Sequence, residues 1–204
     1  SRIYAKRSIR PPRGAERREE MKVDIFNTTN KYNLLYIDPP YRFSQGINPR
    51  KTFNAKGKKE ELNLHYPTMS DKQIKEFDIR NICADQCVMF CWTTDAHLPI
   101  ALEFIKNNGF TYKTIAFVWD KEKAYMGKWN VKQCELCLLA TKGTAHKLLK
   151  SFKARQLIRE EKTIHSKKPT GAYERIEEMF GDIPKIELFA RQSIDGWDCW
   201  GNEI

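Results

Sequence analysis

The sequence predicts one α/β domain in which a mostly parallel sheet carries helices on both faces. From Met21 onward, short apolar runs alternate with segments whose apolar residues recur at helical spacing. Such alternation is typical of parallel strands joined by crossover helices. The chain has 204 residues, of which 41% are hydrophobic, and this fits one buried core and leaves little room for two. We therefore expect residues 21–204 to form a single domain.

Two boundaries are well marked in the first half of this domain. Asn33–Ile37 is a short apolar run stopped by Asp38-Pro39-Pro40, as expected for a buried strand that ends at a functional edge of a sheet. The segment Ser70–Gln73 has the spacing of a capping box. It predicts a helix that begins there, with Ile74 and Phe77 facing the core.

The second half continues the alternation. Four apolar runs have the length of strands: Gln86–Trp92, Thr111–Trp119, Cys134–Thr141 and Lys185–Ala190. A helix from Asp95 to a stop at Gly109 carries a stripe of apolar residues: Leu98, Ala101, Leu102 and Ile105. A last helix, residues 169–180, offers three side chains to the core: Tyr173, Ile176 and Phe180.

Positive charge is in excess, with 36 Lys and Arg against 26 Asp and Glu and a net charge of +10. This surplus favours a polyanionic partner, nucleic acid before an anionic membrane, although a generic charged surface would account for it too. Residues 1–20, with seven Arg or Lys, are interpreted as a basic N-terminal arm or a vector-derived remnant. Arg42–Glu61, with six Lys or Arg and two glycines, is interpreted as a long loop.

Several classes of protein and site are disfavoured by the sequence. No run approaches 18 apolar residues and the N-terminus has no apolar signal segment, so we expect a cytoplasmic protein without a membrane span. The six cysteines lie in apolar runs, which suits reduced thiols. Cys134 and Cys137 should point to opposite faces of a strand, and the spacing of Cys83, Cys87 and Cys91 is off the iron–sulfur pattern, so no metal site is expected.

The segment Asp38-Pro39-Pro40-Tyr41 carries the clearest chemical signal. An exocyclic adenine amine is a poor nucleophile because its lone pair is delocalised into the ring. An enzyme that methylates this amine needs acceptors for both N–H bonds and an aromatic face for the base. Asp38, a Pro39 carbonyl for which no backbone N–H competes, and Tyr41 supply that set on a turn stiffened by both prolines. The simpler alternative is a rigid strand-ending turn with Tyr41 packed in the core.

Four segments in a particular order then make the chain similar to a known family. They are Asp38-Pro39-Pro40-Tyr41, Tyr66-Pro67-Thr68-Met69-Ser70, His165-Ser166-Lys167-Lys168-Pro169, and Ile186-Glu187-Leu188-Phe189-Ala190-Arg191 with Gly201-Asn202. The sequence resembles the N6-adenine methyltransferases typified by the catalytic subunit of the messenger-RNA N6-methyladenosine writer. It looks like a prokaryotic or phage-type DNA adenine methyltransferase relative, and the resemblance runs from about Asp24 to the C-terminus.

The resemblance implies a Rossmann-like, S-adenosylmethionine-dependent methyltransferase fold with permuted motif order, in which the catalytic turn precedes the cofactor strand. It implies that Asp38 and the Pro39 carbonyl orient the target amine and that Tyr41 stacks near the base. Lys168 corresponds to a lysine near the charged end of the cofactor and the target base. The positions that correspond to cofactor-binding residues are Asp24, Ile25, Asp38, Lys168, Arg191, Asn202 and Glu203.

The chain departs from the family pattern at four positions. Tyr41 stands where Trp is more usual, and Glu203 stands where Gln is common. Ser193 and Ile194 stand where the messenger-RNA enzyme has His and Asn. A carboxylate at position 203 still suits a ribose, because it accepts hydrogen bonds from hydroxyl groups.

Residues and resemblance together predict methyl transfer from S-adenosylmethionine to adenine N6 in DNA by a monomer or homodimer. The expected nucleic-acid contacts follow the catalytic turn: Arg42, Arg50, Lys51, Lys56, Lys58 and Lys59. Three alternatives stay open, namely RNA N6-adenosine methylation, a catalytically silent nucleic-acid-binding relative, and methylation of a protein amide. Silent relatives lose the acidic residue of the turn, whereas this chain keeps Asp38.

Overall fold

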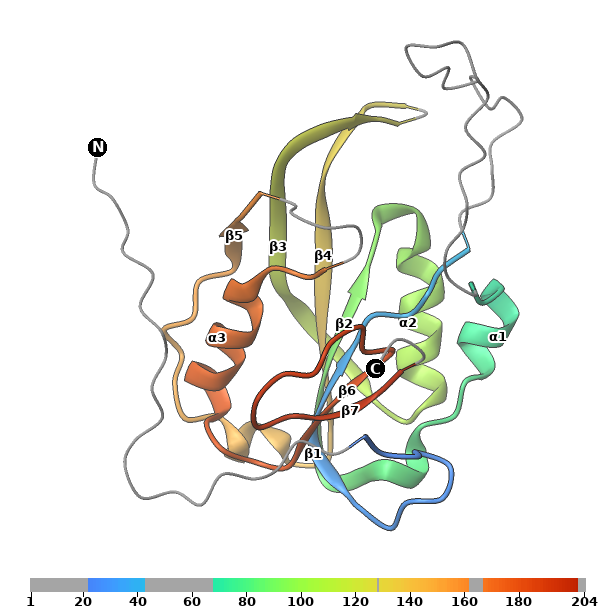
Figure 1. Cartoon of the computed structure of the whole chain (residues 1–204), viewed down its shortest axis with the longest axis vertical. Coiled ribbons are helices and arrows are strands. Elements are labelled where there is room, and N and C mark those ends of the chain that lie inside the picture. Colours follow the sequence, from blue (N-terminus) through green and yellow to red (C-terminus); the bar gives the residue numbers. More distant parts are fainter. Residues whose placement is uncertain (1–21, 43–67, 128, 162–166, 202–204) are drawn as a thin grey trace.

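The computed structural model describes residues 22–42, 68–127, 129–161 and 167–201, with a seven-stranded sheet at the centre (Figure 1). The strands are β1 (Tyr32–Ile37), β2 (Cys83–Thr93), β3 (Thr111–Met126), β4 (Val131–Lys142), β5 (Leu157–Arg159), β6 (Lys185–Leu188) and β7 (Asp198–Trp200). The helices are α1 (Asp71–Glu76), α2 (Leu98–Asn107) and α3 (Thr170–Phe180), with 3₁₀ turns η1 (Arg80–Ile82), η2 (Asp95–His97) and η3 (Ala145–Leu148).

The sheet has the order β5-β3-β4-β2-β1-β6-β7 and is mostly parallel, which confirms the predicted fold class. β1 lies at the centre of the parallel part and pairs in parallel with both β2 and β6. β4 runs against both of its neighbours, β2 and β3. β3 and β4 are longer than their apolar runs, because they continue as a hairpin whose exposed residues carry no core-facing alternation.

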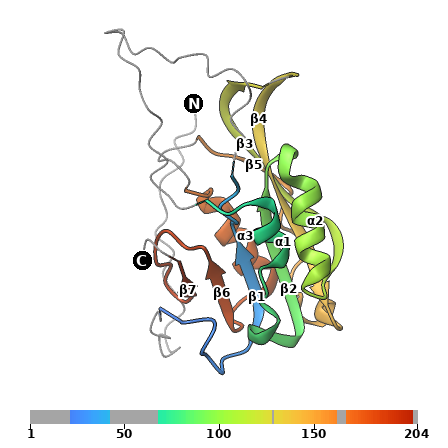
Figure 2. The same ribbon diagram turned by 90° about the vertical axis from the view of Figure 1, so that its right-hand side faces the viewer.

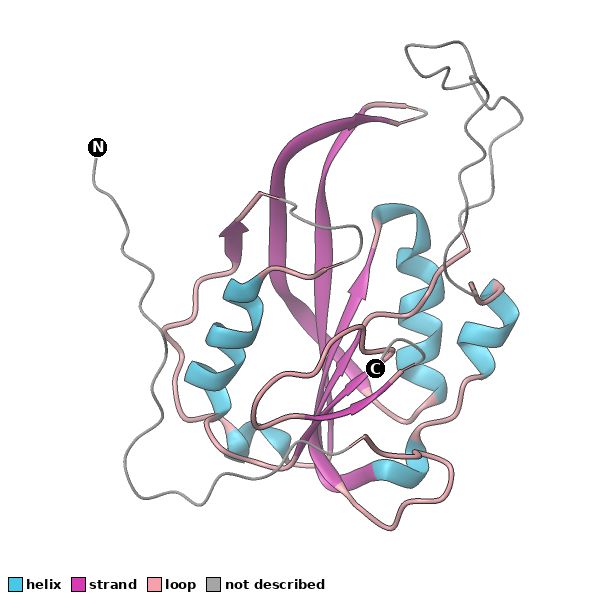
Figure 3. Cartoon of the chain, in the orientation of Figure 1, coloured by secondary structure: helices cyan, strands magenta, loops and turns pink. Residues whose placement is uncertain are grey.

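Helices cover both faces of the sheet, α1 and α2 on one face and α3 on the other (Figure 3). Successive residues of a strand point to opposite faces of the sheet, so the side chains of β1 pack alternately into the core on the α1–α2 side and the core on the α3 side. Leu35 packs in the cluster on the α1–α2 side with Phe104, whereas Tyr36 packs in the cluster on the α3 side with Tyr173. The sequence of a strand that is buried on both faces in this way is a continuous apolar run.

The helix boundaries largely follow their predicted caps. Ser70 Oγ accepts from the backbone N–H of Gln73, and the Gln73 side chain accepts from the backbone N–H of Ser70, so the capping box is confirmed. Gly109 follows the end of α2 with φ 77°, a left-handed conformation that suits glycine. One core assignment was wrong: Leu102 is 36% exposed, because α2 turns Ala101, Phe104 and Ile105 inward instead.

The carboxyl ends of the parallel strands gather at one edge of the sheet, and the β3–β4 hairpin extends beyond that edge (Figure 2). In the described part of the chain, no helix is both long and apolar enough to cross a bilayer. The predicted basic arm, residues 1–20, lies outside the described residues. So do most of the predicted nucleic-acid contacts, namely Arg50, Lys51, Lys56, Lys58 and Lys59.

Candidate active site

The Asp-Pro-Pro-Tyr turn lies at the carboxyl end of the central strand β1. The backbone N–H of Asp38 donates to the Leu188 carbonyl at 3.5 Å, which extends the β1–β6 ladder by one step before the prolines end it. The Pro40 carbonyl accepts from the N–H of Met69 at 2.9 Å. This bond ties the second motif segment to the Asp-Pro-Pro-Tyr turn, although the two are separated in sequence by the basic loop.

Four charged side chains form a continuous chain of ion pairs at this edge. Lys168 Nζ lies 2.9 Å from Asp38 Oδ1 and 2.8 Å from Glu135 Oε2. Lys121 Nζ lies 2.9 Å from Glu135 Oε1. We call Asp38, Lys168, Glu135 and Lys121 the charge chain; each of their side chains is only 11–16% exposed. Charges shielded from water in this way interact more strongly than surface pairs do.

The two carboxylates of the charge chain differ in their electrostatic surroundings. Burial disfavours the charge of Glu135, but Lys168 and Lys121 outweigh that effect and lower the pKa of Glu135 to about 2. Asp38 shares Lys168 with Glu135, and burial outweighs that ammonium, so the pKa of Asp38 lies above its ordinary value. Asp38 is therefore the carboxylate of the chain with the greater tendency to accept a hydrogen bond or a proton.

Lys168 is held as a cation in an aromatic setting. Burial disfavours its charge, but Asp38 and Glu135 outweigh the burial and raise the pKa of Lys168 above its ordinary value. Its Nζ lies 5.2 Å from the centroid of the Trp92 ring, which adds a cation–π contact. The site thus holds a fixed positive charge beside the Asp-Pro-Pro-Tyr turn.

Tyr41 is packed into the core beneath the turn. It is 7% exposed, its hydroxyl donates to the Trp92 carbonyl at 3.2 Å, and its ring stacks on His97 with a centroid distance of 4.6 Å and an interplanar angle of 22°. The base-stacking role of Tyr41 stays a prediction. One expectation was wrong: the Pro39 carbonyl does accept from a backbone N–H, that of Tyr41 at 2.8 Å, because the turn closes tightly. A carbonyl oxygen has a second lone pair, so Pro39 can still accept another bond.

Replacing Tyr41 with alanine should lower the unfolding free energy by about 3–5 kcal/mol, because it empties a buried aromatic site. Tyr41→Phe should lose only the hydrogen bond to Trp92, about 1 kcal/mol. Denaturant unfolding of the three proteins measures both changes. An alanine variant as stable as the wild type would show that the ring is not a core element.

The carboxyl ends of β6 and β7 are closely packed and locally strained. Phe189 directly follows β6 and has φ 60°, a left-handed conformation that is unusual for a bulky residue and found mainly where the surrounding structure imposes it. A Cβ on Gly201 would lie 2.1 Å from the Ala190 carbonyl oxygen, so only glycine fits beside β6. Both features lie where a ligand approaches a parallel sheet.

The predicted cofactor-binding residues divide into three groups. Lys168 and Arg191 are near Asp38, and the Arg191 charge offsets part of the burial that raises the pKa of Asp38. Asp24 is exposed and accepts from the backbone N–H of Phe26 at 3.0 Å, whereas the side chain of Ile25 is buried in the core. Asn202 and Glu203 lie outside the described residues, and so does His165.

An open hollow of about 550 Å³ adjoins the Asp24–Ile25 segment. Its lining combines aromatic rings with amide and carboxylate groups: Phe26, Met69, Gln73, Glu76, Phe77, Asp78 and Asn81. Phe77 also packs against Phe189 and Trp200, with ring centroids 5.2 and 5.6 Å away. One wall of the hollow, formed by Phe77, therefore packs against the strained end of β6.

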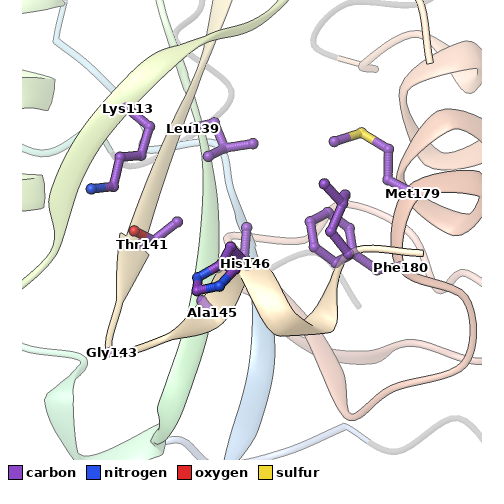
Figure 4. Close-up of a pocket in the computed structure, with 10 residues that line it drawn as sticks. Lys113, Leu139, Thr141, Gly143, Ala145, His146, Met179 and Phe180 are labelled. Carbon is purple, nitrogen blue, oxygen red and sulfur yellow. The ribbon is translucent and has the colours of Figure 1, made fainter. Parts of the chain in front are cut away.

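A second cavity, of about 330 Å³, lies between the end of β4, η3 and α3 (Figure 4). Thr141 and Gly143 are at the carboxyl end of β4, which runs against β1, so this cavity is at the opposite end of the sheet from Asp38. It is lined by none of the predicted site residues. The Asp-Pro-Pro-Tyr turn and this cavity are separate features.

Glu187 is a buried carboxyl group on β6, and both of its oxygens lie 3.1 Å from the Tyr173 hydroxyl that donates to them. Burial raises the pKa of Glu187 to about 8. Between pH ~4.5 and 8 the folded protein therefore holds a proton that the unfolded chain releases. Stability contributed by the protonated form is present below this window and is lost as pH rises through it.

We expect the melting temperature of Glu187→Gln to fall less than that of the wild type between pH 5 and 8.5, because the amide stays uncharged. Thermal unfolding of both proteins across this pH range provides the measurement. Parallel curves would mean that Glu187 does not titrate in this window.

Sequence reasoning missed Glu135, Lys121 and His97. A signal for Glu135 was available, because it is two residues from buried Cys137 and so shares its face of β4.

Cys134 is exposed and Cys137 buried, as predicted from their opposite directions. Within the described residues, no cluster of three or more His, Cys, Asp or Glu side chains could hold a metal ion.

The mostly parallel sheet, the Asp-Pro-Pro-Tyr turn on its central strand and the buried lysine beside that turn are the features expected of an amino-group methyltransferase. The chain belongs to the MT-A70 family, whose model matches residues 32–203. MT-A70 methyltransferases use S-adenosylmethionine in general, and this membership confirms the family and the N6-adenine methyltransferase class predicted from the sequence.

Three known proteins are similar to the chain. Type II methyltransferase M.MunI from Mycoplasma sp is 35% identical over 182 residues, 85% of this chain and 78% of that protein. N(6)-adenine-specific methyltransferase METTL4 from Homo sapiens is 23% identical over 88% of this chain and 39% of its own length. N(6)-adenosine-methyltransferase MT-A70-like from Arabidopsis thaliana is 25% identical over 90% of this chain and 25% of its own length.

Proposed function

We propose that this protein methylates N6 of adenine in DNA, with S-adenosylmethionine as the methyl donor. The observation that carries the proposal is the buried pairing of Asp38 with Lys168 at the carboxyl end of β1. Similarity to a type II methyltransferase over 78% of that protein's length supports DNA as the substrate. The net charge of +10 supports a polyanionic substrate.

In the proposed mechanism, Asp38 and the Pro39 carbonyl accept hydrogen bonds from the two N–H groups of the target amine. These acceptors hold the nitrogen lone pair toward the methyl group, so catalysis comes from orientation and polarisation. When bound, S-adenosylmethionine would supply an electrophilic methyl group on its sulfonium. The amine nitrogen would take that methyl group, S-adenosylhomocysteine would leave, and the proton released from the methylated amine would go to water. The raised pKa of Asp38 suits it to accept from the amine as positive charge builds there.

The chain offers residues that fit the cofactor. We assign Lys168 and Arg191 to its charged end, Asp24 and Ile25 to its adenine, and Asn202 and Glu203 to its ribose. The hollow lined by Phe26, Phe77 and Asn81 has the aromatic and amide groups that an adenine ring requires. We assign the phosphates of the substrate to Arg42 and the basic residues that follow it.

RNA is the second candidate substrate. The similarity to an N(6)-adenosine-methyltransferase MT-A70-like protein favours it, at lower identity and over a smaller share of that protein. The basic loop after the catalytic turn would suit the phosphates of either nucleic acid.

The test is a transfer assay with tritiated S-adenosylmethionine and four acceptors of matched concentration: duplex DNA, single-stranded DNA, RNA and protein. Nucleoside analysis then identifies the modified base. We expect N6-methyladenine in DNA. Label found only in RNA would replace the substrate with the second candidate, and label found only in protein would overturn the proposal.

A further inference from the structure

The β3–β4 hairpin continues beyond the rest of the sheet. β2 ends at Thr93, which pairs with Leu136, so from Glu135 to Val131 β4 pairs with β3 past the end of β2. This extension, residues 120–135, is called the arm. It projects on the side of the sheet where β1 ends and Asp38 lies (Figures 1 and 2).

The tip of the arm is apolar and exposed. Met126 and Val131 are directly paired across the two strands and are 84% and 59% exposed. Trp129, in the connecting turn, is 90% exposed. Apolar side chains that gather on a projecting element and face water mark a contact surface for a partner.

The charge of the arm indicates which partner this is. The three acidic residues of the arm, Asp120, Glu122 and Glu135, lie at its base, whereas from Lys123 to Cys134 the sequence holds three lysines and no acidic residue. If the tips of two copies met, each would bring the same lysines to the contact, and their like charges would oppose association. Nucleic acid complements both the lysines and the apolar tip of the arm, because phosphates attract the lysines and exposed bases stack on a tryptophan face.

The base of the arm is joined to the catalytic turn. Lys121 and Glu135 belong to the arm, and through Lys168 they form the charge chain that reaches Asp38. Lys132 forms an ion pair with Asp95 in η2, which fastens the arm to the body of the domain. A target adenine placed at Asp38 would therefore bring its neighbouring nucleotides toward the arm.

We propose that the arm binds the nucleic-acid strand next to the target adenine, with Trp129 stacked on a base exposed when the adenine leaves the helix. An enzyme that acts on a base within a duplex must take that base out of the stack, which exposes the faces of its neighbours. This inference rests on the proposed function, because it assigns part of the substrate to a surface outside the reacting site.

The experiment compares three variants with the wild type in fluorescence-anisotropy titrations of a labelled, adenine-containing DNA duplex, with RNA of the same sequence as a second probe. Trp129→Ala should weaken binding roughly 5- to 150-fold, the equivalent of the ~1–3 kcal/mol of one stacked base. Trp129→Phe should recover most of the affinity. Phe152→Ala is the matched control, because Phe152 is 89% exposed on the loop between η3 and β5, and should bind as the wild type does.

Two further measurements separate the outcomes. Calorimetric titration with S-adenosylmethionine should give the same affinity for Trp129→Ala and the wild type, which shows that the variant is folded. Sedimentation should give the same mass for both. Unchanged nucleic-acid affinity in Trp129→Ala would overturn the inference, and a dimer lost on mutation with that affinity intact would reassign the tip to self-association.

Failure of the proposed function would look different. A wild-type protein that transfers methyl groups to DNA while Trp129→Ala binds DNA normally contradicts only the role of the arm. If the wild-type protein transfers no methyl group to any polynucleotide but Trp129→Ala weakens nucleic-acid binding, only the proposed reaction is contradicted.

Discussion

Asp38→Ala is expected to lower the turnover of methyl transfer by about 10²–10³-fold or more, with S-adenosylmethionine bound within several-fold of the wild type. The reason is that Asp38 is assigned to the amine, and losing one preorganised polar group at a reacting centre costs this much. The buried Lys168 keeps Glu135 as its partner at 2.8 Å, so the variant should fold. Single-turnover kinetics and calorimetric titration of the cofactor measure the two quantities separately.

Asp38→Asn is the informative companion variant, because the amide keeps an acceptor oxygen but loses the negative charge. We expect it to retain more turnover than alanine and less than the wild type. Full turnover in the alanine variant would remove Asp38 from the reaction, whatever the asparagine variant does.

Lys168→Met should lower both the stability of the protein and its function. It leaves Asp38 buried without its 2.9 Å partner and leaves Glu135 with Lys121 alone. Breaking a buried ion pair by removing one partner costs about 3–5 kcal/mol. Cofactor affinity and turnover should both fall, because the removed ammonium is assigned to the charged end of the cofactor and to the base.

The stability loss of Lys168→Met should shrink as pH falls. In the wild type the lowered pKa of Glu135, about 2, contributes stability that is fully present above pH ~4.5 and is lost as pH falls toward 2. Without Lys168 the pKa values of the Asp38 and Glu135 carboxyls rise, so both groups take up protons at a higher pH than in the wild type. Protonation neutralises the buried charge that Lys168 no longer pairs. Denaturant unfolding at pH 7 and pH 4.5 measures the difference, and an equal loss at both pH values would contradict it.

Lys185→Met is the matched control for this experiment. Lys185 is also a buried lysine and pairs with Glu177 at 3.1 Å, but it lies at the start of β6, away from the Asp-Pro-Pro-Tyr turn. It should lower stability and leave turnover per folded molecule and cofactor affinity unchanged. A loss of cofactor affinity in Lys185→Met would mean that destabilisation alone explains the effect at Lys168.

The sequence by itself determined the features that depend on neighbouring residues. The apolar run Asn33–Ile37 followed by Asp38-Pro39 predicted a buried strand that ends at the reacting edge, because proline cannot continue a ladder. The capping box at Ser70 and the stop at Gly109 were equally local. The family followed from four short segments in order, and the match over residues 32–203 confirmed it.

Only the tertiary structure decided which distant side chains meet. Glu135 and Lys168 are 33 residues apart, and their contact depends on β4 running antiparallel beside β2 while the chain returns before α3. The burial of Tyr41 likewise depends on His97, which η2 brings against its ring. Strand order and direction are set by the packing of the whole sheet, and the charge at Asp38 is set by the neighbours that this packing supplies. The local sequence pattern predicts neither the strand order nor the charge at Asp38, because both arise from contacts between residues far apart in the sequence.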